Sequence, residues 1–305
     1  MTEIASVPGR SLYKYVDLKG LSRILDGSIR FTQPSAFNDP FELLPEVVSP
    51  LSQANQLLRI AFDITAKRRQ HSLPASADEQ DGLVSTDALS RDVVHQLNAL
   101  IGIFCLSKRA DSLLMWAHYA DSYAGAVIEF DGSHEVFSNP IEVDYHRIRP
   151  KISVDFYRNP REPIPVAELC VKSDQWAYEQ EVRVIRPLSE CRKIGTDARQ
   201  FPVYVKDIPA TCIKSVILGE RTPVSEQRNL YARLRESNIG LSISAIDHAG
   251  FNFRTEIVKL RGPHAGPWLS PRTAHIFSDR PTQLGDLARS LIEHHPLSGL
   301  VNKPV

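Results

Sequence analysis

The sequence predicts an α+β protein built on a twisted, mainly antiparallel β-sheet, with a helical insertion at about residues 50–100. The first observation behind this prediction is a series of short segments, between residues 11 and 259, with the apolar pattern of strands. The second is the helical spacing of apolar residues within the insertion. The third is composition: 24% of the 305 residues are charged and 42% are hydrophobic, which is typical of a globular protein.

The N-terminal part is expected to form a strand, a helix and a second strand. Residues 11–16 read as a short strand in which two tyrosines share one face. Asp17 follows as an N-cap, apolar residues then recur at helical spacing, and Gly27 suits the position just beyond a helix C-terminus. A second strand begins at Ile29, and two prolines beside an Asn-Asp pair make residues 33–42 an ordered turn or loop.

The middle of the chain continues this mixture of helices and strands. Within the insertion, an apolar stripe at residues 57–64 and the segment 87–100 are helix candidates. A continuous apolar run at 100–106 predicts a buried strand, and it is followed by a helix at 113–120 and another strand at 125–130. These elements bring the sheet to the centre of the fold.

The later part of the chain supplies a helix at 223–236, the remaining strands and a tail. Beyond Leu260, prolines punctuate the segment 261–305, which contains a short amphipathic helix at 284–294. We therefore expect a single domain over residues 11–260 and a Pro-rich C-terminal tail that docks on the core or on a partner. The remaining strands are expected at 141–145, 179–185, 201–205, 213–218, 241–245 and 255–259.

Charge and composition narrow the class of protein. Lys+Arg and Asp+Glu both total 36, so the net charge does not indicate a nucleic-acid-binding protein. A local basic patch would not be seen in these totals. The four cysteines form no Cys-x-x-Cys pair and suit a reducing compartment. The N-terminus carries no signal-peptide core, and no run of about 18 apolar residues suggests a membrane span. We expect a cytoplasmic protein without a membrane partner.

Several familiar motifs of catalysis are absent from the sequence. It contains no phosphate loop, no His-Glu-x-x-His zinc helix, no Gly-x-Ser-x-Gly elbow and no Gly-x-Gly-x-x-Gly fingerprint. The ten histidines do not stand at ligand spacings with the cysteines, so we expect no metal site. Most hydrolase, kinase and Rossmann-type activities are therefore disfavoured.

The stretch 176–185 carries the most informative pattern in the chain. In a strand, Glu179, Glu181 and Arg183 would share one face, which places two carboxylates side by side. Neighbouring carboxylates raise each other's pKa and are costly unless a partner or a substrate uses them. The alternative is an edge strand whose charged face is solvated, with Arg183 pairing with an acid.

Other candidate binding residues lie in the helix 113–120 and near the N-terminus. Trp116, His118 and Tyr119 place aromatic surface and a titratable ring near one helix end, where Tyr119 could stack on a planar ligand and His118 could donate to a hydroxyl or phosphate. The alternative is that Met115, Trp116 and Tyr119 are core residues at helical spacing. Asn38 lies in a turn, where its side chain either caps the turn or helps the loop to close over a ligand and orient it. Lys14 lies between two tyrosines, and we expect its side chain either to bind a phosphate or hydroxyl group of a ligand or to be exposed to solvent.

Taken together, these segments resemble an uncharacterised bacterial family, a domain of unknown function. Its members have a Leu-Tyr-Lys-Tyr strand, a Pro-Ser-x-Phe-Asn-Asp-Pro-Phe turn, a Cys-Leu-Ser-Lys segment, a Met-Trp-x-His-Tyr-Ala helix, a Gly-x-x-x-Glu-Phe segment and a Lys-Ser-x-x-Trp-x-x-Glu-x-Glu-x-Arg segment. The resemblance covers roughly residues 11–260. The corresponding residues here are 12–15, 34–41, 105–108, 115–120, 125–130 and 172–183.

A second resemblance, to ADP-ribosyltransferases, implies a function. The opening order of strand, helix, glycine and strand is similar to theirs, and Glu-Gln-Glu at 179–181 resembles their Glu-x-Glu strand. The resemblance implies a split sheet, with Glu181 as the catalytic acid and Glu179 selecting or activating the acceptor. Lys14 stands where many members have a His or Arg that holds the NAD ribose, and Phe104 where some have Tyr. The implied cleft is lined by Lys14, Tyr15, Ser107, Tyr119 and Glu181.

The implied activity is transfer of ADP-ribose from NAD, as substrate, to a macromolecular acceptor (protein or nucleic acid), a role that would suit a toxin or defence effector. Cleavage of the nicotinamide–ribose bond passes through an oxocarbenium-like transition state, which a carboxylate under the ribose stabilises. One alternative is a non-catalytic nucleotide- or partner-binding module on the same fold, which the departure at Lys14 favours. Another is a metal-independent nuclease or hydrolase that uses Glu179, Glu181 and His118.

Overall fold

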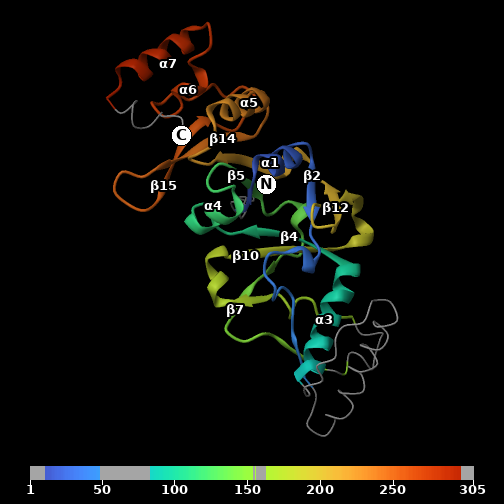
Figure 1. Cartoon of the computed structure of the whole chain (residues 1–305). Coiled ribbons are helices and arrows are strands. Elements are labelled where there is room, and N and C mark those ends of the chain that lie inside the picture. The colour runs from blue at the N-terminus through green and yellow to red at the C-terminus, as the bar shows by residue number, and fades with distance from the viewer. Residues whose placement is uncertain (1–10, 49–82, 154, 156–162, 297–305) are drawn as a thin grey trace, which may run out of the picture.

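The computed structural model describes residues 11–48, 83–153, 155 and 163–296, and its centre is an eight-stranded sheet (Figure 1). The strand order is β15-β14-β13-β5-β1-β4-β10-β6. All neighbouring pairs are antiparallel except β13 and β14, so the expected α+β class with a mainly antiparallel sheet is confirmed. These strands are β1 (Ser11–Val16), β4 (Ile101–Ser107), β5 (Ala126–Asp131), β6 (Ile141–Glu142), β10 (Glu181–Pro187), β13 (Ile213–Leu218), β14 (Gly240–Ile246) and β15 (Phe253–Lys259).

Smaller sheets flank the main one. A three-stranded sheet joins β11 (Arg192–Thr196), β12 (Pro202–Asp207) and β2 (Ser28–Phe31). Two parallel pairs join β3 (Glu46–Val48) to β8 (Lys151–Ser153), and β7 (Asp144–His146) to β9 (Val171–Ser173). The strands β3, β8 and β9 were not expected, because three residues are too few for an alternating pattern to stand out.

The expected signals at the N-terminus are confirmed. Helix α1 (Leu18–Leu25) begins where the Asp17 carboxylate accepts a hydrogen bond of 2.6 Å from the Gly20 amide. The chain leaves the helix through Gly27, whose φ of 89° lies in the left-handed region that glycine adopts without steric cost. The return into β2 then places the second strand where the sequence predicts it.

The other helices are α3 (Leu83–Leu100), α4 (Leu113–Tyr119), α5 (Val224–Leu234), α6 (Ala274–Phe277) and α7 (Gln283–His294). The second helix of the insertion is therefore confirmed as part of α3, whereas the apolar stripe at 57–64 lies outside the described residues. No helix within the described ranges combines the length and apolar character needed to cross a membrane. Short 3-10 helices are η1 (Pro34–Ala36), η3 (Glu135–Phe137), η5 (Asp174–Glu179), η6 (Leu188–Glu190) and η7 (Ala210–Cys212).

One face of the main sheet is covered by α1, α5 and the C-terminal segment. Leu12, Phe104 and Phe130 belong to a continuous apolar cluster that also takes in residues of α5 and α6. The rings of Tyr231 in α5 and Phe277 in α6 meet edge to face, with centroids 5.1 Å apart. The tail therefore docks on the core of this chain, and α5, α6 and α7 gather at one end of the molecule (Figure 1).

The opposite face carries two separate apolar clusters. Helix α4 covers β1 and β5 by packing Trp116 against Tyr15 and Val127. Helix α3 covers β4 through a stripe with spacing of four residues, which packs against Ile103. Between the two clusters, polar side chains of β4 and β10 are left without an apolar cover, and the candidate site forms there.

A seam divides the main sheet between β1 and β4. These strands pair at a single position, Tyr13 with Ser107, whereas β1 pairs with β5 along six residues and β4 with β10 along seven. Beyond that position, Lys14 reaches across and donates a hydrogen bond of 2.8 Å to the carbonyl of Cys105. The sheet thus consists of a five-stranded part and a three-stranded part whose adjoining strands are paired at one position.

Two expected strands need correction. Glu179 is not in a strand: it ends η5, and Gln180 then adopts a left-handed conformation with φ of 42° before β10 begins at Glu181. Alternation over three residues does not distinguish a strand from a 3-10 turn that enters one. The expected strand 141–145 is two strands, because the chain leaves β10 at Val143 and continues alongside β9.

Candidate functional site

A cavity of about 410 Å³ lies along the seam between β1 and β4. It receives side chains from both strands and from η1, the 37–38 turn, α4, β9, η5, β10 and the loop between β11 and β12. Its size falls within the range of small-molecule sites, about 300–1,000 Å³. The lining residues are Tyr13, Lys14, Tyr15, Thr32, Ala36, Phe37, Asn38, Cys105, Leu106, Ser107, Met115, His118, Tyr119, Lys172, Glu179, Glu181 and Arg199.

Glu181 is held at the cavity wall by two cations. Its Oε1 lies 2.9 Å from Nε of Arg183, two residues along the same strand, and its Oε2 lies 3.1 Å from Nζ of Lys172. The hydroxyl of Tyr145 accepts a hydrogen bond of 2.8 Å from the Glu181 amide. The side chain of Glu181 therefore has a fixed position, and only 5% of the residue is exposed.

Behind Glu181, Arg183 is completely buried between two carboxylates. Its Nη1 forms an ion pair of 2.6 Å with Oε1 of Glu42, and its Nη2 donates to Oε2 of Glu42 at 2.9 Å. A buried guanidinium is tolerated only when its charge is matched, and the two carboxylates provide that match. This explains why the turn at 34–42 lies against β10, which is more than 140 residues later in the chain.

Glu179 reaches the same cation from its 3-10 helix. Its Oε2 lies 2.6 Å from Nζ of Lys172, and its Oε1 accepts a hydrogen bond of 2.6 Å from the Tyr119 hydroxyl. Asn38 donates to that hydroxyl at 3.2 Å, and Ser107 donates to the backbone carbonyl of Glu179 at 2.6 Å. We call the five charged residues Glu42, Lys172, Glu179, Glu181 and Arg183 the buried ionic cluster.

The charges of this cluster reinforce one another. Burial alone would raise the pKa of Glu181, but the neighbouring Arg183 and Lys172 hold that pKa well below its usual range. Burial alone would lower the pKa of Lys172, but the nearby glutamates hold it well above its usual range. Burial raises the pKa of Glu42, and Arg183 offsets this only in part. At neutral pH the carboxylate of Glu181 and the ammonium of Lys172 are both charged.

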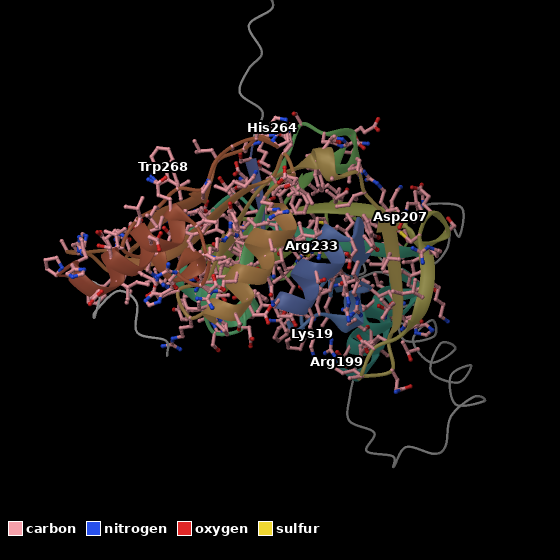
Figure 2. All side chains as sticks on the ribbon, turned by 90° about the horizontal axis from the view of Figure 1, so that it is seen from above. Lys19, Arg199, Asp207, Arg233, His264 and Trp268 are labelled. Atoms are coloured by element: carbon pink, nitrogen blue, oxygen red, sulfur yellow. The ribbon has the colours of Figure 1, made fainter. Side chains whose placement is uncertain are left out.

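Two other cations line the cavity outside this cluster. Lys14 lies over the ring of Phe104, with Nζ 5.2 Å from its centroid, while it donates to the Cys105 carbonyl. Arg199 is exposed in the loop between β11 and β12 and donates to the carbonyl of Ala36. Figure 2 shows Arg199 on the same side of the molecule as Lys19 and far from Trp268 of the C-terminal segment. Arg199 is therefore a residue of the cavity rim.

The aromatic candidates divide into lining and supporting residues. His118 and Tyr119 line the cavity from the end of α4, with ring centroids 6.2 Å apart. Tyr15 also lines it, and its hydroxyl donates to the Arg109 carbonyl at 3.0 Å. Trp116, which the sequence suggests as a ligand contact, does not line the cavity: it is 1% exposed and packs behind Tyr15. The alternative of a core role is correct for Trp116.

Eight of the nine candidate residues from the sequence thus line one cavity. Four further residues of the site were not among the candidates: Glu42, Tyr145, Lys172 and Arg199. Lys172 is the first residue of the 172–183 segment, and Glu42 directly follows the Asn-Asp-Pro-Phe turn, so both belong to parts of the sequence already noted. The signal at Glu42 is a charged residue between two apolar neighbours, Phe41 and Leu43. Nothing in the sequence connects Tyr145 or Arg199 to the site, because only the fold brings them there. The eight are Lys14, Tyr15, Asn38, Ser107, His118, Tyr119, Glu179 and Glu181.

Cys105 is not an activated nucleophile, although it lines the cavity. Burial and the adjacent Glu181 raise the pKa of its thiol well above the usual value, so the thiol is protonated at neutral pH. Among the residues that the structure describes, no group of three or more His, Cys, Asp or Glu side chains is arranged to hold a metal ion. The chemistry of the site is therefore interpreted from its carboxylates and cations.

Comparisons of this chain with protein-family models, with curated proteins and with solved structures gave no match. The resemblances noted from the sequence therefore rest on the motifs themselves.

The lowered pKa of Glu181 predicts an acid-sensitive fold. A carboxyl whose pKa is lower in the folded than in the unfolded protein stabilises the fold above its unfolded pKa, about 4.3, and that stabilisation is lost as the pH falls. Between pH 5 and pH 3, Glu181 should account for a loss of about 1.5 kcal/mol in the free energy of unfolding. Urea titrations of the wild type and Glu181→Gln at both pH values measure this loss.

The raised pKa of Glu42 acts with the opposite sign, and part of that rise comes from the charge of Glu181, so the difference between wild type and variant reports Glu181 together with its effect on Glu42. Glu190→Gln is the control, because Glu190 is exposed and forms only a surface ion pair of 3.3 Å with Lys206. Equal losses of stability in the wild type and Glu181→Gln between the two pH values would contradict the prediction.

Proposed function

We propose that this protein binds NAD at the seam and cleaves its nicotinamide–ribose bond, as an enzyme of the ADP-ribosyltransferase type. The observation that carries the proposal is a cavity that has both an acidic wall, from β10 and η5, and a basic wall, from β1 and the loop between β11 and β12. Glu181 and Glu179 mark the first wall, and Lys14 and Arg199 mark the second. NAD has a matching polarity, because its pyrophosphate is anionic and its reacting ribose develops positive charge.

The charge of the acidic wall supports this assignment. When all its members are ionised, the buried ionic cluster holds three carboxylates and two cations, which leaves one negative charge in excess. Within a partly enclosed cavity such a charge acts through a lower dielectric than water provides. A carboxylate fixed before the reaction stabilises an oxocarbenium-like centre without having to reorganise. Glu181, anchored at both oxygens, is the residue that meets this requirement.

The rest of the cavity offers suitable contacts for the other parts of NAD. The rings of Tyr119 and His118 lie beside the acidic wall, where they would contact the nicotinamide and orient it for departure. Lys14 and Arg199 would bind phosphate oxygens, since both can donate charge-assisted hydrogen bonds. In this arrangement the resemblance to ADP-ribosyltransferases and the charge distribution both favour a position of the reacting ribose at Glu181, whereas the charge distribution assigns Lys14 to the phosphates rather than to the ribose.

A second candidate is a nucleotide-binding module without catalytic activity. It is favoured by the neutralisation of Glu181, whose two oxygens are both in contact with cations. If that neutralisation persists when the ligand is bound, the carboxylate would stabilise a positive centre only weakly. The two candidates differ in one observable: the module binds NAD and releases no nicotinamide.

The proposal is tested by calorimetry with NAD and by measurement of nicotinamide release. Binding and release in the wild type are expected, and Lys14→Met should weaken NAD binding about tenfold, which corresponds to ~1.4 kcal/mol. Lys19→Met is the matched control, because Lys19 is exposed on α1 and outside the cavity. Absence of NAD binding would refute the proposal, and binding without release would favour the non-catalytic module.

A further inference from the structure

We infer that the acceptor of the ADP-ribosyl group in this protein is water, so that the net reaction is hydrolysis of NAD. The inference rests on the proposed function and narrows it. It follows from the state of Glu179, to which the resemblance to ADP-ribosyltransferases assigns acceptor activation, and from the enclosure of the acidic wall.

Both oxygens of Glu179 already have partners within the chain. Oε1 accepts from the Tyr119 hydroxyl and Oε2 contacts the Lys172 ammonium, each at 2.6 Å. Glu179 is 4% exposed, and the bond between Ser107 and its carbonyl fixes the backbone as well. A carboxylate in this setting does not extend from the surface to meet the side chain of another macromolecule.

The surroundings of Glu181 are equally closed to large acceptors. It is 5% exposed, and Lys172 lies between it and Glu179 as a bridge. Asn38 contacts the Tyr119 hydroxyl from the other side, so the turn that carries Asn38 is linked to α4 across the cavity. The acidic wall is therefore reached through the cavity itself.

The size of the cavity limits what can enter beside the nucleotide. Its volume of about 410 Å³ is near the lower end of the range for small-molecule sites, about 300–1,000 Å³. A nucleophile has to come within about 3–3.5 Å of the reacting carbon, aligned with the bond that breaks. A protein side chain or a nucleobase would have to fit beside the nucleotide in order to reach the acidic wall, whereas a water molecule needs very little space there.

The reaction is balanced without any further reactant. The oxygen of water forms a bond to C1′ of the ribose as the bond from C1′ to the nicotinamide nitrogen breaks, and the bonding electrons leave with nicotinamide. One proton of the water is released to solvent. The products are ADP-ribose, nicotinamide and one proton, and Glu181 stabilises the positive charge that develops at C1′.

The test follows the label of NAD radiolabelled in its adenylate part, with the full-length protein and added protein and RNA from a cell extract. Nicotinamide, free ADP-ribose and acid-precipitable label are measured in parallel. We expect free ADP-ribose to equal nicotinamide, and precipitable label to stay at the level given by free labelled ADP-ribose, which controls for spontaneous attachment.

Each outcome has a separate meaning. Nicotinamide release with label on protein or RNA, well above the ADP-ribose control, would overturn the inference and leave the proposed function in place. No release of nicotinamide at all would overturn the proposed function and the inference with it. Alcohols supply a second measurement: methanol should be captured at C1′ as the methyl glycoside of ADP-ribose, with release of nicotinamide and one proton. Capture of benzyl alcohol with equal efficiency would contradict an enclosed acceptor position.

Discussion

Replacing Glu181 by glutamine is expected to lower the rate of nicotinamide release at least about 10²-fold while NAD binding changes little. The substitution keeps the size and shape of the side chain but removes the charge that would face C1′. A group that acts only as the positive centre develops contributes to the rate and not to ground-state binding. Turnover measured by nicotinamide release, together with calorimetry of NAD binding, separates the two effects.

The control for this experiment is Glu190→Gln, which removes an exposed carboxylate remote from the cavity lining. Its rate should equal that of the wild type. Because Glu181 also contacts Arg183 and Lys172, circular dichroism and a thermal unfolding curve should first establish that Glu181→Gln is folded at the assay temperature. A folded Glu181→Gln protein that turns over NAD at the rate of the wild type would eliminate Glu181 as the catalytic acid.

Replacing Arg183 by methionine is expected to destabilise the folded state by about 3–5 kcal/mol. Arg183 is 0% exposed and is the direct partner of Glu42, so methionine would leave that carboxylate buried without a cation. Methionine fills much of the space of the arginine chain, so the loss reports chiefly on charge. Denaturant titration by tryptophan fluorescence and circular dichroism gives the free energy of unfolding.

Two further variants identify the cause of the loss. Arg192→Met removes an exposed arginine that pairs with Asp207 at 3.1 Å, and it should change stability by less than about 1 kcal/mol. Adding Glu42→Gln to Arg183→Met should restore part of the stability, because the uncompensated buried charge is then removed. If the double variant is no more stable than Arg183→Met, burial of the Glu42 charge is not the cause.

Local signals predicted the elements around the seam well. Asp17 and Gly27 fix the ends of α1 by capping and by left-handed geometry, both of which depend on residues close in sequence. The buried strand β4 was recognisable because both of its faces are apolar over most of its length. Where an element is defined by its own caps and apolar pattern, the sequence alone was sufficient to predict it.

The composition of the site depended on contacts between distant segments. Arg183 was expected to pair with an acid, but its second partner, Glu42, comes from a turn 141 residues earlier in the chain. Lys172 bridges both candidate acids from β9, a strand of three residues that carried no recognisable pattern. Glu179 was assigned to the correct site but to the wrong element, since a single left-handed residue separates its 3-10 helix from β10.

The seam has a consequence for how the cavity could change over evolution. In a continuous ladder, the distance between strands is fixed by regular backbone hydrogen bonds. Here the spacing beyond Tyr13 is bridged by side chains, such as Lys14 on the Cys105 carbonyl and Tyr15 on the Arg109 carbonyl. Tyr15 also packs against Trp116, so Lys14 is the position at which a substitution would widen or narrow the opening while each part of the sheet kept its own ladder and apolar packing. Ligand size is therefore a trait that single mutations can alter at little expense to the rest of the fold.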